Sequence, residues 1–378
     1  NSATSDAITT AADGTCTAKI TGMTGGGGLS HRNKIINGAM TVSQRHGTTV
    51  VTGVNSTGYR IDRWTHQMAS VNSAFSVSQS TDSPDGFSNS YKIDVTTADT
   101  SLAAAHAHFF RQKIEGQNLQ DFAKGTSSAK QFALSFYVKT NKTGVYTVEL
   151  YDVDNNRAIS KTFTVADSNW NRYTIIFPAD TTGAFDNDNG NSLVVQFFLS
   201  AGSNYTNNGT FNNSAWGSLS GKSRVSSSNV NFADSTSNNW YITGVQLEVG
   251  DTATSFEHRS YGEELRRCYR YFQRRTSSDN YQWVSLVSFY TGSEIHGFFD
   301  HYETMRASPT LSADTGSNTL AVQRAGGSVA WSTGIIKNGG DSNVTYYYRD
   351  GVSLGTSGQC GRCLTWTAGC NITLSAEL

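Results

Sequence analysis

The sequence predicts an all-β protein, in which an antiparallel sandwich is followed by a short helix and a smaller C-terminal β domain. The composition supports this class, because 37% of the 378 residues are hydrophobic, 16% are charged and 36 are Gly. Disordered chains share this polarity but are poor in aromatic residues, and here there are 19 Phe, 17 Tyr and 7 Trp. With 3 Pro in the chain, β-branched and aromatic runs are free to form ladders, and Gly and Asn shape the turns.

Alternation with a period of two is the second observation, and it recurs from about Asn33 to His258. In Gln131 to Thr140 and in Leu193 to Leu199, apolar side chains occupy every second position, so each strand buries one face. Polar loops at Asn187 to Asn191 and Ser203 to Asn213 are long enough to carry recognition. The same alternation marks three further strands, which contain Tyr146, Val148 and Leu150, then Tyr173 through Phe177, then Val245, Leu247 and Val249.

A change of period predicts the helix. From Tyr261 the apolar residues Leu265, Cys268 and Phe272 follow at helical spacing, with glutamates early and arginines late, which suits the helix dipole. Two interpretations stay open. The helix packs on the sandwich, or it forms a short coiled coil, for which two heptads are too few to decide.

Glycine marks the first domain boundary. Four consecutive glycines within Thr24 to Ser30 exclude a helix or a central strand, so we predict a joint there, after a short β-like stretch at Cys16 to Ile20. Residue 1 is Asn, and we expect the numbering to begin inside a longer protein. Strands resume after Thr276, and Asp350-Gly351 is the predicted hairpin turn between Val344 to Arg349 and Val352 to Leu354. The predicted parts are a linker segment at 1–30, the sandwich at 31–258, a helical connector at 259–276 and the C-terminal β domain at 277–378.

Charge and hydropathy argue against two classes of partner. A formal net charge of -1 gives no reason to expect nucleic acid, whose phosphates require clustered Lys and Arg. The sequence contains no apolar run of about 18 residues, so no membrane span is predicted. It also lacks a charged start followed by an apolar stretch, so no signal peptide is predicted. A neutral surface suits a neutral or weakly charged glycan.

The cysteines do not predict a disulfide framework, because the five of them are odd in number and scattered. Cys360, Cys363 and Cys370 offer three thiols for zinc, but no fourth ligand stands at a usual spacing. Buried or free thiols are the favoured interpretation, and neither a metal nor any other cofactor is predicted.

One loop matches the way in which proteins bind sugars in water. An aromatic ring packs on the apolar side of the sugar, and amide or charged groups bind its hydroxyls. The candidate carbohydrate-binding residues here are Tyr205, Trp216, Asn204 and Asn208. The alternative is that Trp216 caps the sandwich core, since Trp is usually well buried.

A second candidate carbohydrate-binding group, Tyr346, Tyr348 and Arg349, lies beside the predicted turn. Because side chains alternate along a strand, Tyr347 must point away from Tyr346 and Tyr348. At least one face of this strand therefore belongs to the core or to a subunit interface.

Aspartate pairs and histidine pairs have both functional and structural interpretations. The histidines His106 and His108 share a strand face and could hold a metal at a threefold axis, although this spacing also arises by chance. The aspartates suggest calcium or a glycosidase acid pair, but the Asn and Gly around them favour ordinary turns. These aspartates are Asp152 with Asp154, and Asp186 with Asp188. No nucleophile elbow, phosphate loop or zinc-hydrolase helix occurs, so no catalytic residue is predicted.

Tryptophans within strand-like runs are predicted to be core. They are Trp64, Trp170 and Trp240. Beside the first of them, Asp62 and Arg63 could bind a ligand, but a structural pair is the favoured interpretation.

Three stretches resemble a recurring module of marine and cyanobacterial phage virion proteins, which are described as tail-fibre or structural proteins. They are Asn33 to Met40 (NKIINGAM), Thr243 to Gly250 (TGVQLEVG) and Phe256 to Tyr271 (FEHRSYGEELRRCYRY). Four shorter phrases fit the same pattern in the same order, so the resemblance covers about Arg32 to Gln273. These phrases are Gln112 to Gly116, Ser135 to Lys139, Phe177 to Asp188 and Ala201 to Tyr205.

The resemblance implies a jelly-roll similar to carbohydrate-binding modules, a virion location outside the host cell and a distal C-terminal β domain. It implies that 1–30 is the end of a fibre shaft, and that the partners are two further copies in a homotrimer and other phage tail proteins. Jelly-roll sugar-binding modules often hold calcium through an aspartate on the last strand, but Ile242 to Val245 lacks that acid. The expected function is an adhesin for host polysaccharide or lipopolysaccharide. The alternatives are a glycan-degrading tailspike and a purely structural spacer or decoration protein.

Overall fold

The computed structural model describes residues 8–10, 16–18, 31–276, 279–315, 319–331, 334–352 and 355–378. It divides into two compact units, Asn1–Arg259 and Ser260–Leu378. Within the first, β1 (Ile8–Thr10) and β2 (Cys16–Ala18) pair as antiparallel strands. The predicted glycine joint at Thr24 to Ser30 lies outside the described residues.

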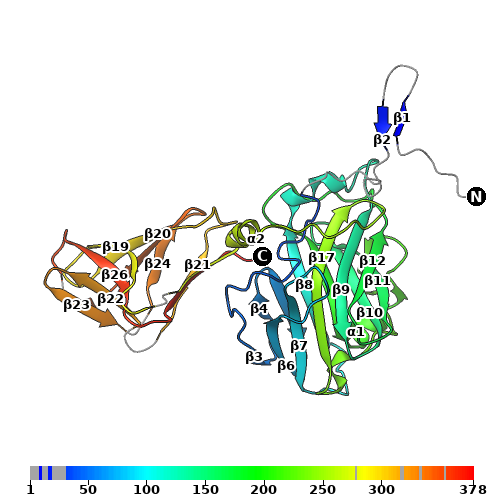
Figure 1. Cartoon of the computed structure of the whole chain (residues 1–378), viewed down its shortest axis with the longest axis horizontal. Coiled ribbons are helices and arrows are strands. Elements are labelled where there is room, and N and C mark those ends of the chain that lie inside the picture. Colours follow the sequence, from blue (N-terminus) through cyan, green and yellow to red (C-terminus); the bar gives the residue numbers. More distant parts are fainter. Residues whose placement is uncertain are drawn as a thin grey trace, which may run out of the picture. The chain divides into compact units, whose positions relative to one another are not determined.

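The first unit is an antiparallel sandwich of two sheets, as the sequence predicted (Figure 1). From edge to edge, the seven-stranded sheet contains β15 (Gly217–Ser218), β11 (Arg157–Val165), β10 (Gly144–Asp152), β13 (Asn191–Ala201), β8 (Ala107–Glu115), β5 (Trp64–Ala69) and β4 (Gly58–Ile61). The six-stranded sheet contains β12 (Asn171–Phe177), β9 (Phe132–Thr140), β17 (Asn239–Val249), β7 (Ser90–Thr97), β6 (Ala74–Ser80) and β3 (Val51–Val54). Neighbours with distant sequence numbers, such as β17 between β9 and β7, give the jelly-roll its crossovers.

Period-two alternation correctly predicted which side chains form the core between these sheets. In β9 the residues Phe132, Leu134, Phe136 and Val138 are all 0% exposed. The alternate residues of β13 and β10 meet them from the opposite sheet in one apolar cluster. Burial at about 25 cal/mol per Å² of apolar surface makes this cluster the main stabilising feature of the unit.

Short elements connect the strands of the first unit. Three are single turns of 3-10 helix: η1 (Gly116–Asn118), η2 (Gln120–Phe122) and η3 (Phe232–Asp234). The rest lie in one long connection between β13 and β17, namely α1 (Ser203–Thr206), β14 (Thr210–Phe211) and β16 (Lys222–Ser223). Strands β14 and β16 pair in parallel.

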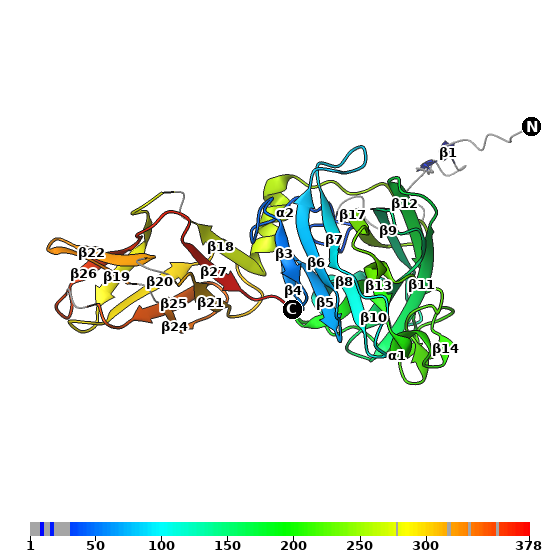
Figure 2. The same ribbon diagram turned by 90° about the horizontal axis from the view of Figure 1, so that it is seen from below.

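The second unit begins with the predicted helix, α2 (Tyr261–Tyr269), whose N-cap Ser260 accepts a hydrogen bond from the Glu263 backbone. The helix is shorter than the apolar stripe suggested, because Phe272 already belongs to strand β18. A three-stranded sheet contains β18 (Phe272–Thr276), β27 (Asn371–Ser375) and β21 (Thr310–Ala313). The larger sheet, partly visible in Figure 2, contains β23 (Gly327–Trp331), β22 (Leu320–Arg324), β26 (Cys360–Thr365), β19 (Trp283–Phe289), β20 (Ile295–Asp300), β25 (Val344–Arg349) and β24 (Ile336–Gly340).

The hairpin predicted around Asp350-Gly351 is wrong in its pairing. Strand β25 has β20 on one side and β24 on the other, so both of its edges are taken before the chain reaches Gly351. After the turn, the Val352 backbone N–H donates to Ser293 instead. A local turn signal cannot reveal that other strands already occupy both edges. Among the described residues, no helix is long and apolar enough to cross a membrane.

Candidate functional site

A row of polar and aromatic side chains crosses the outer face of the seven-stranded sheet. Paired residues on neighbouring strands point to the same face, and their register can be followed from β4 to β11. The row consists of Tyr59, Thr65, Arg111, Gln196, Glu149 and Ser160. The intervening residues, such as Phe110 and Phe197, point into the core, so this row lies on the side away from the second sheet.

Side-chain contacts fix the polar groups of the row. Arg111 donates to the Gln67 amide oxygen at 2.5 Å. Further along, Arg224 donates through Nε to Glu149 at 2.9 Å, and Gln196 donates to the other oxygen of the same carboxylate. These contacts restrict the guanidinium groups to defined positions before any ligand arrives.

Two tyrosines lie near the ends of the row: Tyr59 belongs to it, and Tyr151, two residues from Glu149 and on the same face of β10, is counted with it. Tyr59 is half-buried on β4, with the Arg45 guanidinium 5.2 Å from its ring centroid. Tyr151 is half-buried on β10, and the Arg224 guanidinium lies 5.3 Å from its ring centroid. With neighbouring strands about 4.8 Å apart, four inter-strand steps place β4 and β10 about 19 Å from each other.

Burial differs along the row and changes the acidity of its groups. Glu149 is 0% exposed, whereas the Arg224 side chain that covers it is 23% exposed. Burial alone would lower the pKa of Arg224, but the Glu149 charge raises it above its usual value. Burial lowers the pKa of Arg111, and the nearby Arg224 charge lowers it further. Both side chains remain cations at neutral pH.

The connection between β13 and β17 covers the other part of this face. Val225 and Tyr205 pack there against Phe109 and Phe198 in a small apolar cluster. Hydrogen bonds to backbone carbonyls hold this connection in place. The Val225 N–H donates to Tyr205 O, and the side-chain amide of Asn212 donates to Ala158 O. The loop predicted to carry recognition is therefore mainly a cover, and the open part of the face lies toward β4, β5 and β8.

The loop candidates lie in different environments and do not form one group. Asn204 and Asn208 are exposed, and Tyr205 is half-buried against Phe198. Trp216 is only 7% exposed, and its indole N–H donates to Pro178 O at 2.8 Å. Of the two interpretations of Trp216, the structure favours the core cap, because a ring packed against Phe132 is closed to a ligand.

The C-terminal candidates lie on β25 and alternate as predicted. Tyr347 is 0% exposed, Tyr346 is 50% exposed, and Tyr348 is half-buried. Arg349 is half-buried and donates to Gly334 O at 3.3 Å. Tyr346 has Phe298 opposite it on β20, so this face of the sheet is more apolar than the sequence suggested.

The aspartates considered for calcium or catalysis have structural partners. Asp152 is fully buried and lies 2.5 Å from the ammonium of Lys124. Asp154 accepts a hydrogen bond from the Asp186 backbone at 2.9 Å, and Asp188 accepts one from Gly190 at 2.8 Å. The Asp188 contact is a local turn, the interpretation that the sequence favoured, whereas the Asp154 contact joins two separate loops.

The histidines considered for an axial metal lie inside the sandwich. Both His106 and His108 are 0% exposed. His108 Nε2 lies 3.2 Å from Nδ1 of His66, whose Nε2 lies 2.7 Å from the Tyr91 hydroxyl. Complete burial argues against the alternative of a metal held by these histidines at a threefold axis between subunits. Burial lowers the pKa of all three histidines, that of His66 to about 3.

Two of the three tryptophans predicted to be core are buried. Trp64 and Trp240 are 0% exposed, but Trp170 is half-buried and donates to Asp82 at 2.9 Å. Asp62 and Arg63 are each 1% exposed and have structural partners. Asp62 accepts from the Gln44 backbone N–H and side chain, and Arg63 donates to Lys113 O.

The cysteines do not form a metal site within the described residues. Cys363 and Cys370 are buried free thiols, Cys360 is an exposed free thiol, and Cys268 is buried in α2. No group of three or more His, Cys, Asp or Glu that could hold a metal ion occurs in the described part of the chain.

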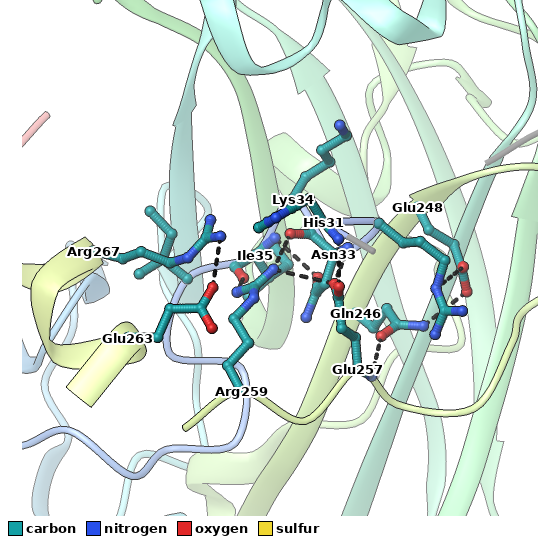
Figure 3. Close-up of polar contacts among 12 residues, drawn as sticks. His31, Asn33, Lys34, Ile35, Gln246, Glu248, Glu257, Arg259, Glu263 and Arg267 are labelled. Atoms are coloured by element: carbon teal, nitrogen blue, oxygen red, sulfur yellow. Dashed lines mark hydrogen bonds and ion pairs between the residues drawn. The ribbon is translucent and has the colours of Figure 1, made fainter. Parts of the chain in front are cut away.

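Residues from the three stretches that carry the resemblance meet in one polar cluster. Figure 3 shows Arg259 pointing toward the backbone of Asn33 and Ile35, to which it donates. Glu257 accepts from the Asn33 N–H at 2.8 Å, and its own N–H donates to Gln246. Burial alone would raise the pKa of Glu257, but the Asn33 N–H and the Arg259 charge lower it. The cluster joins both ends of the sandwich and has a structural role.

Sequence reasoning missed the residues of the outer row. Outward positions could be inferred from alternation, because Arg111 neighbours the core residue Phe110 in β8. Which outward residues of different strands lie side by side depends on register, for which the sequence gives no signal. Only the register joins Tyr59, Arg111 and Glu149.

Comparisons with known proteins found structural likenesses of low identity and low TM-score. No family model matches the chain, and no curated protein matches it. Among solved structures, a family 11 carbohydrate-binding module of the cellulosomal cellulase Lic26A-Cel5E of Clostridium thermocellum is similar. Its identity is 12% and its TM-score 0.27, over 57% of this chain and 100% of that one.

Two further solved structures show similar values. TmCBM61, described in complex with β-1,4-galactotriose, has 9% identity and a TM-score of 0.27 over 58% of this chain and 99% of its own. An apo cyclase from Fischerella sp. has 12% identity and a TM-score of 0.30 over 59% of this chain and 98% of its own. Values this low do not extend the likeness to a ligand or an activity.

Proposed function

We propose that the chain is the receptor-facing part of a bacteriophage tail fibre, exposed on the virion, and that it binds a host-surface polysaccharide or lipopolysaccharide. The observation that carries the proposal is the outer-face row of the first unit, together with Arg224, which covers Glu149. The phage context is supported by the motif resemblance.

The row supplies both parts of a sugar site. The half-buried rings of Tyr59 and Tyr151 offer apolar surface, and between them Arg111, Arg224 and Gln67 offer hydrogen-bond donors and acceptors. Because Gln196 and Glu149 are buried, the accessible groups lie toward the two ends, and a span of about 19 Å between β4 and β10 suits a chain of several sugars. Contacts to single sugars are weak, and several copies on one fibre multiply them by avidity.

Replacing Tyr59 or Tyr151 by Ala is expected to weaken binding of the full chain to host cells about tenfold, because each change removes one ring from the row. Saturation binding of fluorescently labelled protein to intact cells measures this. Tyr241→Ala is the matched control, since Tyr241 is also half-buried but lies on β17 of the other sheet. Equal binding by all three variants and the wild type would place the receptor site elsewhere.

We also propose that the row binds its glycan without cleaving it. Glycoside hydrolysis uses two carboxyl groups about 5–10 Å apart across the bond. Glu149 is the only carboxylate of the row, and it is fully buried and held by Arg224 and Gln196. This arrangement supports an adhesin over a tailspike.

The second unit supports the proposed homotrimer. Its larger sheet carries exposed apolar side chains in register on β19, β20 and β25, namely Leu286 (63% exposed), Phe298 (47%) and Tyr346 (50%). Leu and Phe offer no hydrogen bond to a sugar, and a contiguous exposed apolar face is typical of a protein interface. We therefore assign this face to contact with other copies of the chain. Other phage tail proteins are the further partners that the motif resemblance implies.

In light scattering at micromolar concentration, the wild type is expected to show three times the mass of one chain, and Leu286→Asp the mass of one. A buried unpaired carboxylate at each interface is costly enough to separate the copies. Thr310→Asp is the control, because Thr310 is exposed on β21 of the other sheet of this unit. A wild type with the mass of one chain would contradict the trimer without affecting the glycan row.

A further inference from the structure

Arg111 is the one charged member of the outer row that forms no ion pair with an oppositely charged side chain. It donates to the neutral Gln67 amide and lies 5.4 Å from the Phe109 ring centroid. No described carboxylate forms an ion pair with it, and its Nε is buried without a hydrogen-bond partner. The carboxylate nearest in the row, Glu149, is already engaged by Arg224 and Gln196.

This arrangement is unfavourable in the free protein. A half-buried guanidinium has lost part of its hydration, and a buried donor without a partner adds a further cost. A second cation, Arg224, acts on Arg111 and lowers its pKa further. An unpaired cation held beside a second cation is the electrostatic pattern of a site that receives an anion.

The surroundings of Arg111 define where that anion would lie. Arg111 belongs to β8, between the Tyr59 end of the row on β4 and the Glu149–Arg224 pair beyond β13. Gln67 accepts from Nη2 of the guanidinium group, which orients the half-buried cation on this face of the sheet, and a charge-assisted hydrogen bond to an oxyanion is stronger than one to a neutral group. A sugar carrying an acidic substituent would place its ring against Tyr59 and its negative charge at Arg111.

We propose that the glycan taken by the outer row is acidic, and that Arg111 binds the anionic substituent of one of its sugars. The inference rests on the proposed glycan-binding function and names the substrate class of that same site. It revises the expectation of a neutral or weakly charged glycan, which came from the net charge of -1 for the whole chain. Net charge averages over the surface and does not report on one row.

The first test compares one polymer in two forms, polygalacturonate and the same polymer after reduction of its carboxyl groups. The full chain is expected to bind the acidic form about tenfold more tightly or better, and the difference is expected to shrink as salt is added. Dextran sulfate and a phosphorylated dextran serve as further arms, which separate a preference for carboxylate from one for sulfate or phosphate.

The second test uses Arg111→Met, which keeps an unbranched apolar side chain on β8 and removes the guanidinium group. It is expected to lose about tenfold or more in affinity for the acidic polymer and clearly less for the reduced polymer, because only the acidic polymer loses a charge-assisted contact. Arg172→Met is the matched control, because Arg172 is an exposed arginine on β12 of the other sheet. Melting temperatures of both variants show whether the fold is retained.

The outcomes separate the inference from the function on which it rests. A wild type that binds the reduced polymer as tightly as any acidic one overturns the acidic preference and leaves glycan binding standing. An Arg111→Met variant that weakens binding of both forms equally overturns the part of Arg111 in anion binding and leaves glycan binding standing. A chain that binds none of these polymers and no host polysaccharide overturns both proposals.

Discussion

Replacing Lys124 by Met is expected to lower the free energy of unfolding of the first unit by about 3–5 kcal/mol, the usual cost of breaking a buried ion pair from one side. The Lys124 ammonium is fully buried between Asp152, at 2.5 Å, and Asp180, at 3.1 Å. It also donates to the backbone oxygens of Thr182 and Gly183. The variant would leave Asp152 buried without its cation.

The physical reason for the large effect is the closed surroundings of this charge. The rings of Phe185 and Trp216 lie 5.1 and 5.4 Å from the ammonium, so water has little access to the two carboxylates. Arg157 holds Asp180 through two hydrogen bonds of 2.9 Å, and this second pair remains in the variant. The destabilisation should therefore come mainly from Asp152.

Urea denaturation of the full chain, followed by tryptophan fluorescence, measures this change. Lys139→Met is the matched control, because Lys139 forms a pair of 2.7 Å with Asp82 in which the two side chains are 30% and 39% exposed. An exposed pair contributes about 1 kcal/mol or less, so the control should remain close to the wild type. If Lys124→Met were no less stable than Lys139→Met, the buried cage would not stabilise the fold.

Acidification from pH 7.5 to pH 5 is expected to destabilise the first unit by several kcal/mol. Desolvation by burial lowers the pKa of His66 to about 3, whereas an unfolded His titrates near 6.5. Folding therefore excludes a proton that the unfolded chain binds. The contribution of neutral His66 to the free energy of unfolding is fully present above about pH 6.5 and is lost as the pH falls toward the folded pKa. At pH 5 the loss amounts to about 2 kcal/mol for His66 alone.

The other two buried histidines act in the same direction. Burial lowers the pKa of His108 well below its usual value, and the neighbouring His66 and His106 would repel a proton further. Burial also lowers the pKa of His106, although Asp99, 3.6 Å away, opposes the shift. Arg60 is the further charged side chain that acts on this cluster, and it disfavours protonation of His66.

Unfolding free energies at pH 7.5, 6.5, 5.5 and 5 measure the effect. The double variant His66→Gln with His108→Gln is expected to show a shallower fall, because two of the three titrating groups are gone. His296→Gln is the control, since His296 is half-buried in the second unit beside Glu294. A wild-type stability that stayed constant down to pH 5 would mean that these histidines are protonated in the folded state.

Local patterns in the sequence were sufficient wherever the structure depends on local geometry. The alternation at Phe132, Leu134, Phe136 and Val138 predicted a strand and its buried face, because strand periodicity is a property of the backbone. The change of period at Tyr261 predicted the start of α2 for the same reason. The same pattern did not predict where α2 ends, because the apolar spacing continued through Phe272, which lies in β18.

Turn chemistry was less informative, because a turn does not determine which strands pair. Asp350-Gly351 lies at the end of β25, but β20 and β24 already flank that strand. Composition was also insufficient for single residues in loops. Trp216 matched a sugar site in the sequence, and only the packing against Phe132 and Lys124 shows that the ring is buried.

The sequence by itself determined that this protein is all-β, which residues of each strand face inward, and where the helix begins. Those properties follow from periods of two and of about 3.6 residues, which are encoded within a few positions. Only the tertiary structure decided which strands lie side by side, because pairing joins residues as distant as Tyr59, Arg111 and Glu149. The burial of Lys124 and His66 depends on that same pairing, and so do the outer row and the unpaired charge of Arg111.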